Sequence, residues 1–153
     1  MINFSKKAAD RFKVKWSGLP EQQGDFWKID IVMVGRFPIL LIIHEYTLFT
    51  LVRMKKDFKN LKQVIEEIRC CCPWYRYVGQ CVIGKNGDRR LSGSINEIKK
   101  RTWYMEGFPE DLPGLEQSIN TSLFSSLSPK KNDYGTPFET MALYKQGQWP
   151  VSK

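Results

Sequence analysis

This sequence of 153 residues lacks several features, and each absence narrows its function. Acidic residues are not in excess: 24 Lys and Arg outnumber 16 Asp and Glu, which excludes a DNA-mimic protein. Long apolar runs are also missing, since the densest one, Phe37–Ile43, is far below the ~20 residues that cross a bilayer. The N-terminal residues show no apolar stretch followed by a small-residue cleavage site, so we expect no secretory signal and no membrane partner.

Metal-binding patterns are scarce as well. The chain has one histidine, His44, and four cysteines: Cys70, Cys71, Cys72 and Cys81. Adjacent cysteines have poor geometry for disulfides, and no Cys-x-x-Cys pair is present for structural zinc. We therefore expect reduced thiols in a cytoplasmic protein, with neither a metal nor another cofactor. A thiol made reactive by nearby Arg69 and Arg76 stays an alternative.

The composition is that of a folded domain. Apolar residues make up 42% of the chain and aromatic residues 13%, which argues against disorder. A chain of this length hides roughly 70% of the surface that its unfolded form exposes, so it needs no metal or disulfide to hold a core. We expect one domain over residues 1–153, with a loose tail from about residue 146.

Positive charge is concentrated in the first two thirds of the chain. Residues 1–101 carry 20 Lys and Arg against 10 acids, whereas residues 102–153 carry 4 against 6. Such a surplus can simply keep a protein dispersed in solution. It is also the electrostatic footprint expected of a protein that binds a polyanion such as RNA or DNA.

The first half of the chain predicts strands around one short helix. Ile2–Phe4 is an opening strand, and Lys6–Phe12 follows as a helix. Period-two alternation, a continuous apolar run and short connections then predict an antiparallel meander from Trp27 to Arg53. The apolar run Pro38–Ile43 is typical of a central strand covered on both faces.

A helix is predicted over Asp57–Arg69, with Asp57 as its N-cap and Pro73 after its end. Its apolar face is formed by residues at helical spacing: Phe58, Leu61, Val64, Ile65 and Ile68. Four lysines crowd the beginning of this helix, where the helix dipole disfavours cations: Lys55, Lys56, Lys59 and Lys62. They form either a solvated face or a contact surface for a partner.

The second half predicts a hairpin followed by helices. Asn86-Gly87 favours a tight turn between strands at Tyr77–Gly84 and Arg89–Ser92. Ser94-Ile95-Asn96-Glu97 reads as a capping box that starts a helix reaching about Met105. Further helices are predicted from Asp111 to Leu123, and from a second capping box, Thr136-Pro137-Phe138-Glu139, to about Leu143. The predicted fold is α+β: an antiparallel sheet, meander plus hairpin, packed by three to five helices.

One string of residues near the middle of the chain is distinctive: Asp88-Arg89-Arg90-Leu91-Ser92-Gly93-Ser94-Ile95-Asn96-Glu97. It is similar to the signature of an uncharacterised bacterial and phage family, the domain of unknown function 6933, although it departs at Asp88, Arg90 and Ser92. Further similarities lie at Ser5-Lys6-Lys7, Trp27, Thr47-Leu48-Phe49 and Thr136-Pro137. The resemblance implies a single α+β domain from bacteria, phages or mobile elements, and it implies no activity.

The signature also has a physical interpretation. Gly93 would permit a tight strand-to-helix turn, and Ser94 would cap the helix with Asn96 in its first turn. Arg89 would then either pin this turn by hydrogen bonds or, together with Arg90, create an anion site at the helix start.

Three function classes follow from these observations. We expect a binding protein rather than an enzyme, one that docks on nucleic acid or a nucleoprotein complex. A phage or mobile-element modulator of host defence, such as an anti-CRISPR inhibitor, would fit. The candidate nucleic-acid or anion-binding residues are Lys55, Lys56, Arg76, Lys85, Arg89, Arg90, Ser94 and Asn96.

The first alternative is a protein–protein interaction module whose anchors would be aromatic residues: Trp74, Tyr75, Tyr77, Trp103 and Tyr104. The second is a small metal-independent ribonuclease of toxin type. Its candidate groups are His44, Glu45, Tyr46, Arg89 and Arg90, but no spacing singles them out.

Overall fold

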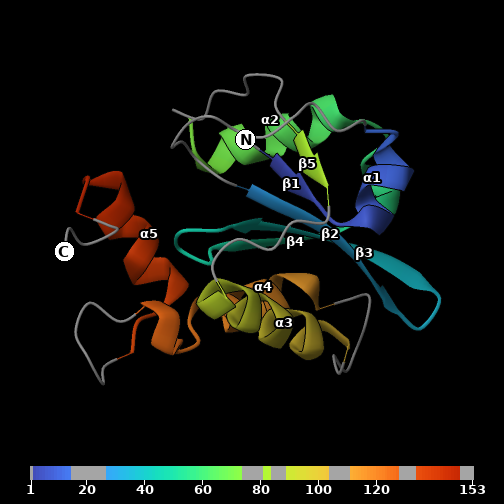
Figure 1. Ribbon diagram of the computed structural model, residues 1–153. Coiled ribbons are helices and arrows are strands. Elements are labelled where there is room, and N and C mark those ends of the chain that lie inside the picture. The colour runs from blue at the N-terminus through green and yellow to red at the C-terminus, as the bar shows by residue number, and fades with distance from the viewer. Residues whose placement is uncertain are drawn as a thin grey trace.

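The computed structural model describes residues 2–14, 27–73, 81–83, 89–103, 111–127 and 134–148. Within these residues a five-stranded sheet with the order β4-β3-β2-β1-β5 lies between two layers of helices (Figure 1). The strands are β1 (Ile2–Phe4), β2 (Trp27–Val34), β3 (Phe37–His44), β4 (Thr50–Met54) and β5 (Cys81–Ile83). The fold is α+β, as the sequence predicts.

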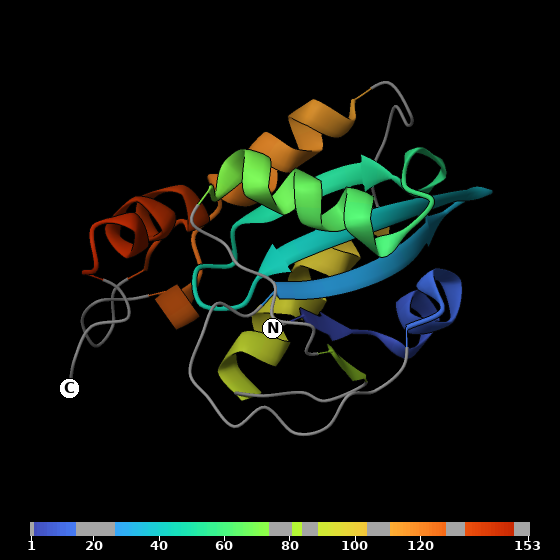
Figure 2. The ribbon, with the colours of Figure 1, turned by 90° about the horizontal axis from the view of Figure 1, so that it is seen from above.

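Helices cover both faces of the sheet. They are α1 (Lys6–Phe12), α2 (Leu61–Cys71), α3 (Arg89–Trp103), α4 (Leu112–Asn120) and α5 (Pro137–Lys145), with short 3-10 turns η1 (Lys55–Asp57) and η2 (Ser125–Leu127). Helices α1 and α2 lie on one face, α3 and α4 lie on the other, and α5 lies beside one end of the sheet (Figures 1 and 2). The predicted tail begins just after α5, and residues 149–153 lie outside the described part of the chain.

The predicted meander is confirmed. Strands β2 and β3 pair antiparallel from Trp27↔His44 to Val34↔Phe37, and β3 pairs antiparallel with β4. A two-residue turn joins β2 to β3, and its first residue, Gly35, has a φ of +60°, which glycine adopts without steric cost.

The middle strand of the meander separates two hydrophobic cores. Leu40 and Ile42 enter the core under α1 and α2, which we call the α1–α2 core. Ile39, Leu41 and Ile43 enter the core under α3 and α4, which we call the α3–α4 core. All five side chains are fully buried, so the prediction of a central strand covered on both faces is confirmed.

The sheet differs from the prediction in its last two strands, which make it mixed. The short β1 pairs in parallel with β2 on one side and with β5 on the other. β5 falls inside the predicted strand Tyr77–Gly84, but its neighbour is β1 rather than Arg89–Ser92. The predicted turn at Asn86-Gly87 lies outside the described residues.

The predicted strand Arg89–Ser92 is wrong, because helix α3 already begins at Arg89. Ser94 therefore lies inside the helix and caps nothing, and its hydroxyl oxygen is 2.7 Å from that of Ser126. Glu97 pairs instead with Arg101 one turn later, at 3.7 Å. Gly93 is an exposed helical residue with open space around it rather than a strand-to-helix turn.

Helix α2 begins later than predicted. Asp57 ends η1, and the N-cap is Asn60, whose side-chain oxygen accepts a hydrogen bond from the Gln63 amide at 3.0 Å. The predicted apolar face is confirmed: Phe58, Val64 and Ile68 are buried in the α1–α2 core, with Leu61 and Ile65 partly buried against it. The helix ends at Cys71, two residues before Pro73.

The last two helices agree with the sequence in part. Asp111 precedes α4 but makes no side-chain capping hydrogen bond, and α4 ends at Asn120 rather than Leu123. Thr136 does cap α5, because its hydroxyl accepts a hydrogen bond from the Glu139 amide at 3.2 Å.

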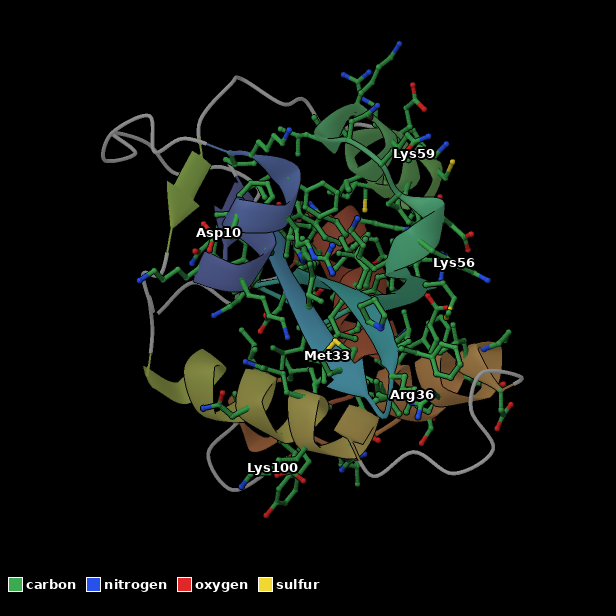
Figure 3. All side chains as sticks on the ribbon, turned by 90° about the vertical axis from the view of Figure 1, so that its right-hand side faces the viewer. Asp10, Met33, Arg36, Lys56, Lys59 and Lys100 are labelled. Carbon is green, nitrogen blue, oxygen red and sulfur yellow. The ribbon has the colours of Figure 1, made fainter. Side chains whose placement is uncertain are left out.

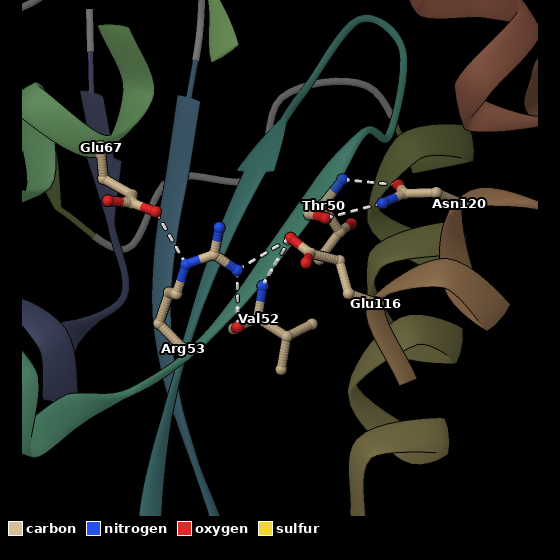
Figure 4. Close-up of polar contacts among 6 residues, drawn as sticks. All are labelled: Thr50, Val52, Arg53, Glu67, Glu116 and Asn120. Carbon is tan, nitrogen blue, oxygen red and sulfur yellow. Dashed lines mark hydrogen bonds and ion pairs between the residues drawn. The ribbon is translucent and has the colours of Figure 1, made fainter. Parts of the chain in front are cut away.

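Side chains of α4 cover the outer edge of the sheet at β4 (Figure 4). The Thr50 amide donates to the side-chain oxygen of Asn120, whose side-chain nitrogen donates to the Thr50 carbonyl, both at 2.9 Å. The Val52 amide donates to a Glu116 carboxylate oxygen at 3.4 Å. Helix α4 thus satisfies backbone groups that an edge strand normally presents to solvent.

Candidate polyanion-binding surface

Two segments that are far apart in sequence contain most of the net positive charge. Residues 6–13 and 55–62 together hold eight Lys and Arg against two Asp, a surplus of six in a chain whose formal charge is +8. We call these two segments the basic layer. Its cations are Lys6, Lys7, Arg11, Lys13, Lys55, Lys56, Lys59 and Lys62.

The fold brings both segments of the basic layer to the same face of the sheet. Phe12 of α1 and Phe58 after η1 are buried in the same α1–α2 core. The two segments also touch directly, because the Lys55 ammonium lies 5.7 Å from the centre of the Phe12 ring. Burial of the apolar side chains leaves the charged ones outside: seven of the eight cations are exposed, and Lys55 is half-buried.

Three cations elsewhere in the described structure, Arg53, Lys99 and Arg101, are paired with acids. Arg53 bonds to Glu67 at 2.8 Å and to Glu116 at 2.9 Å. Burial would lower the pKa of Arg53, but these two carboxylates raise it above its ordinary value. Lys99 likewise pairs with the buried Asp30 at 2.7 Å. By contrast, no cation of the basic layer forms an ion pair with any residue that the structure describes.

The tip of the β2–β3 hairpin lies beside the basic layer. Arg36 is exposed at the turn, and Met33 emerges on the side of α1 and α2 because it alternates along β2 with Ile29 and Ile31 of the α1–α2 core. Figure 3 shows Met33 and Arg36 at the centre of one side of the molecule, with Lys56 and Lys59 beyond them. This side therefore combines unpaired cations with an exposed apolar side chain.

The structure separates the candidate residues predicted from the sequence. Lys55 and Lys56 belong to the basic layer, but Ser94 and Asn96 lie on α3, on the opposite face of the sheet. Because Ser94 is inside the helix, the predicted anion site at a helix start there is not formed. The remaining candidates, Arg76, Lys85 and the side chains of Arg89 and Arg90, lie outside the described part.

The aromatic residues predicted as anchors of a protein interface also lie outside the described part; they are Trp74, Tyr75, Tyr77, Tyr104 and the side chain of Trp103. Sequence reasoning missed the four cations of residues 6–13 and Arg36 as parts of a candidate site. The charge density of residues 6–13 equals that of residues 55–62 and is visible in the sequence, but their adjacency depends on the tertiary fold.

Two of the candidate ribonuclease residues, His44 and Tyr46, pack against each other at the end of β3, with ring centroids 5.9 Å apart. His44 is 1% exposed, and its Nδ1 lies 2.8 Å from the Thr47 hydroxyl. Aromatic rings enclose it, with centroids at 4.9 Å for Trp27 and 4.7 Å for Tyr144. A histidine closed in this way cannot exchange a proton with a substrate, so the geometry favours a structural role for it.

Glu45, another candidate, follows His44 directly after the end of β3. Burial raises the pKa of its carboxyl, while a 3.3 Å hydrogen bond from the Asn3 side chain and the charge of Lys28 partly oppose the shift. The hydrogen bond from Asn3 connects this carboxyl to β1, and the described structure shows no hydrogen bond between the side chains of Glu45 and His44.

Among the described residues, no cluster of three or more His, Cys, Asp or Glu side chains could hold a metal ion. None of the described helices combines the length and apolarity that a membrane span needs.

The chain was compared with curated proteins, solved structures and family models, and it matches no curated protein and no solved structure. The part of the chain that is matched contains Ser5-Lys6-Lys7, Trp27 and Thr47-Leu48-Phe49 and both segments of the basic layer, because residues 1–69 match the family model of the domain of unknown function 6933. These residues form β1 to β4, α1 and most of α2, and they do not include the string 88–97. The predicted resemblance to the domain of unknown function 6933 is confirmed over residues 1–69.

Proposed function

We propose that the protein is a non-enzymatic nucleic-acid-binding protein that contacts the phosphate backbone through its basic layer. The observation that carries the proposal is the contrast in pairing. Arg53 on β4 and both Lys99 and Arg101 on α3 are paired with acids, whereas the eight cations of the basic layer have no ion-pair partner in the described structure.

Unpaired cations held close together repel one another, and a polyanion removes this repulsion when it binds. Each phosphate that a cation neutralises also releases a condensed counterion, which makes binding strong at low salt and weak at high salt. Seven of the eight cations are lysines, whose flexible ammonium groups act as point charges on phosphates. This chemistry supports binding to the backbone with little sequence preference.

The nucleic acid can be free or part of a nucleoprotein complex. A modulator of host defence that occupies such a complex, as an anti-CRISPR inhibitor does, is one setting in which this surface would act.

The test is a titration of a labelled 20-base-pair duplex at several salt concentrations, followed by fluorescence anisotropy. Replacing Lys56 and Lys59 by Gln should weaken binding and flatten the slope of log K against log salt by up to about 1.8, at about 0.9 per lost phosphate contact. The matched control replaces Arg69 and Lys145 by Gln, which removes the same charge from the last turns of α2 and α5.

The control variant should keep the slope of the unmodified protein. The proposal is wrong if the unmodified protein shows no salt-sensitive binding to DNA or RNA, or if the control loses as much affinity as the Lys56/Lys59 variant.

A further inference from the structure

The tip of the β2–β3 hairpin exposes large apolar side chains next to a cation. Met33 is 40% exposed and Phe37 is 44% exposed, and the exposed Arg36 lies between them in sequence. Elsewhere in the described residues, large exposed apolar side chains occur near α5 and after α4, at Leu123, Tyr134 and Phe138. Exposed apolar groups beside polar or charged residues are typical of an interaction surface.

We propose that this hairpin tip enters the minor groove of duplex DNA and that Met33 and Phe37 act there as wedges between neighbouring base pairs. This inference rests on the proposed function, and it identifies duplex DNA as the bound polyanion. Proteins that bend DNA from the minor groove use apolar side chains of this kind to unstack a base step. The negative electrostatic potential of a narrow minor groove attracts arginine side chains.

The shape of the tip suits this role. The turn has two residues, and Gly35 with its positive φ lets the strands reverse without a bulky loop. Met33 lies on the α1–α2 side of the hairpin, while Phe37 pairs with Val34 of the α3–α4 core and so lies on the other side. The two apolar side chains therefore flank the turn from opposite faces, with Arg36 between them.

The basic layer is placed to hold the same duplex. Met33 is paired across the strands with Pro38, and the next residue of β3, Ile39, is paired with Met54. Lys55 and Lys56 follow Met54 directly, so they begin two strands away from Met33. Two strand spacings are about 10 Å, which is about three base-pair steps along a duplex. Lysines at that distance can contact phosphates that flank the wedge.

Insertion would also bury the apolar side chains that are exposed at the tip. The bases would cover these side chains, and the lysines would neutralise phosphates beside the minor groove, which widens as the duplex bends toward the major groove. Together these contacts offset the energy that is needed to unstack a base step.

The experiment uses the full chain and a duplex that carries 2-aminopurine, whose emission rises when the base is unstacked, with a donor and an acceptor dye at the two ends. The unmodified protein should raise the emission and bring the ends closer, because wedge insertion bends DNA by roughly 20–90°. The double variant Met33→Thr/Phe37→Thr keeps residues that suit strands. It should lose at least half of the emission change while its salt slope stays the same.

Leu123→Thr is the matched control, since Leu123 is 64% exposed but lies after α4. It should behave as the unmodified protein, and a thermal melt should show that both variants are folded.

The wedge is wrong if salt-sensitive binding occurs without any rise in emission, or if the double variant unstacks as well as the unmodified protein; the proposed function then stands. Equal unstacking of a duplex RNA of the same sequence would overturn the assignment to DNA. Failure to bind any nucleic acid would overturn both proposals, and binding of the tip to a protein surface would then be the remaining interpretation.

Discussion

Cations on the two faces of the sheet have different surroundings. On the α3–α4 side, Lys99 bonds to Asp30, and at the adjoining sheet edge Arg53 bonds to Glu67 and Glu116. On the α1–α2 side, the cations of the basic layer lie at the surface without an ion pair to a described residue. The paired cations connect elements of the fold, whereas the unpaired ones contribute little to it and stay available to a partner.

This difference separates residues that can be changed without loss of the fold from residues that cannot. Surface charges away from specific contacts usually change the free energy of unfolding by no more than about 0.5 kcal/mol. Removal of one member of a buried ion pair costs roughly 3–5 kcal/mol, because the other charge is left buried without its partner. Variants of the two faces should therefore divide into those that impair binding and those that impair stability.

The largest expected loss of stability comes from truncating a buried residue of α2 beneath the basic layer. Ile68 is fully buried in the α1–α2 core, so Ile68→Ala should lower the free energy of unfolding by about 2–5 kcal/mol. Leu61→Ala should cost clearly less, because Leu61 is partly exposed. Urea denaturation measures both, and equal losses would mean that α2 is not anchored through the face that contains Ile68.

A smaller loss is expected when a paired cation is removed from α3. Asp30 has a side chain that is 4% exposed, and Lys99→Met leaves this carboxylate buried without its cation. The loss should be about 3 kcal/mol, at the low end of the range, because the Lys99 side chain is itself 27% exposed. The neighbouring Lys100→Met is the control and should stay within about 0.5 kcal/mol. Equal losses in the free energy of unfolding for Lys99→Met and Lys100→Met would contradict the distinction between paired and unpaired cations.

Replacement of the side chain that caps the sheet edge should cost about 2 kcal/mol. Asn120→Ala leaves the amide and the carbonyl of Thr50 without their partners, and each unsatisfied buried group costs roughly 1–3 kcal/mol. Alanine has a higher helix propensity than asparagine, and this difference offsets part of the loss. Hydrogen exchange of the Thr50 amide should accelerate in the variant, and an unchanged exchange rate would show that another group replaces Asn120.

The smallest effect concerns pH. The folded state raises the pKa of Glu45, chiefly by burial, so it binds the proton more tightly than the unfolded state does. This contribution to stability is present below the unfolded-state pKa of about 4.3 and is lost as pH rises through the raised folded-state pKa. Glu45→Gln has no such proton to lose. Its stability relative to the unmodified protein should therefore increase as pH rises from 4 to 7, and a constant or decreasing difference would contradict the raised pKa.

Local patterns predicted the first part of the fold well. The alternation in β2, the apolar run of β3 and the short connections to β4 all depend on neighbouring residues, and Lys6–Phe12 is helical as expected. The parallel pairing of β1 with β5 joins Ile2 to Cys81, a contact that no local signal contains.

Capping signals were less reliable than hydrophobic periodicity. Ser94 and Glu97 have the spacing of a capping box, but the arginines and leucine before Gly93 favour a helix that continues through them. The sequence predicts Asp57 as the N-cap of α2, but Asn60 caps the helix, and Phe58 between them is buried in the α1–α2 core. Of the candidate site, the sequence predicted the lysines of η1, whereas the contribution of α1 required knowledge of the packing between Phe12 and Lys55.

The contact between α4 and β4 also has a consequence for self-association. A sheet edge with free amides and carbonyls invites another chain to extend it, which is a common beginning of strand exchange and fibril growth. Asn120 forms with Thr50 the same pair of hydrogen bonds that an added strand would form, and Glu116 occupies the amide of Val52. The polar side chains of one helix thus act as a substitute strand. We expect this edge to resist polymerisation even at high concentration. If α4 detaches, the exposed edge of β4 should pair with strands of other chains.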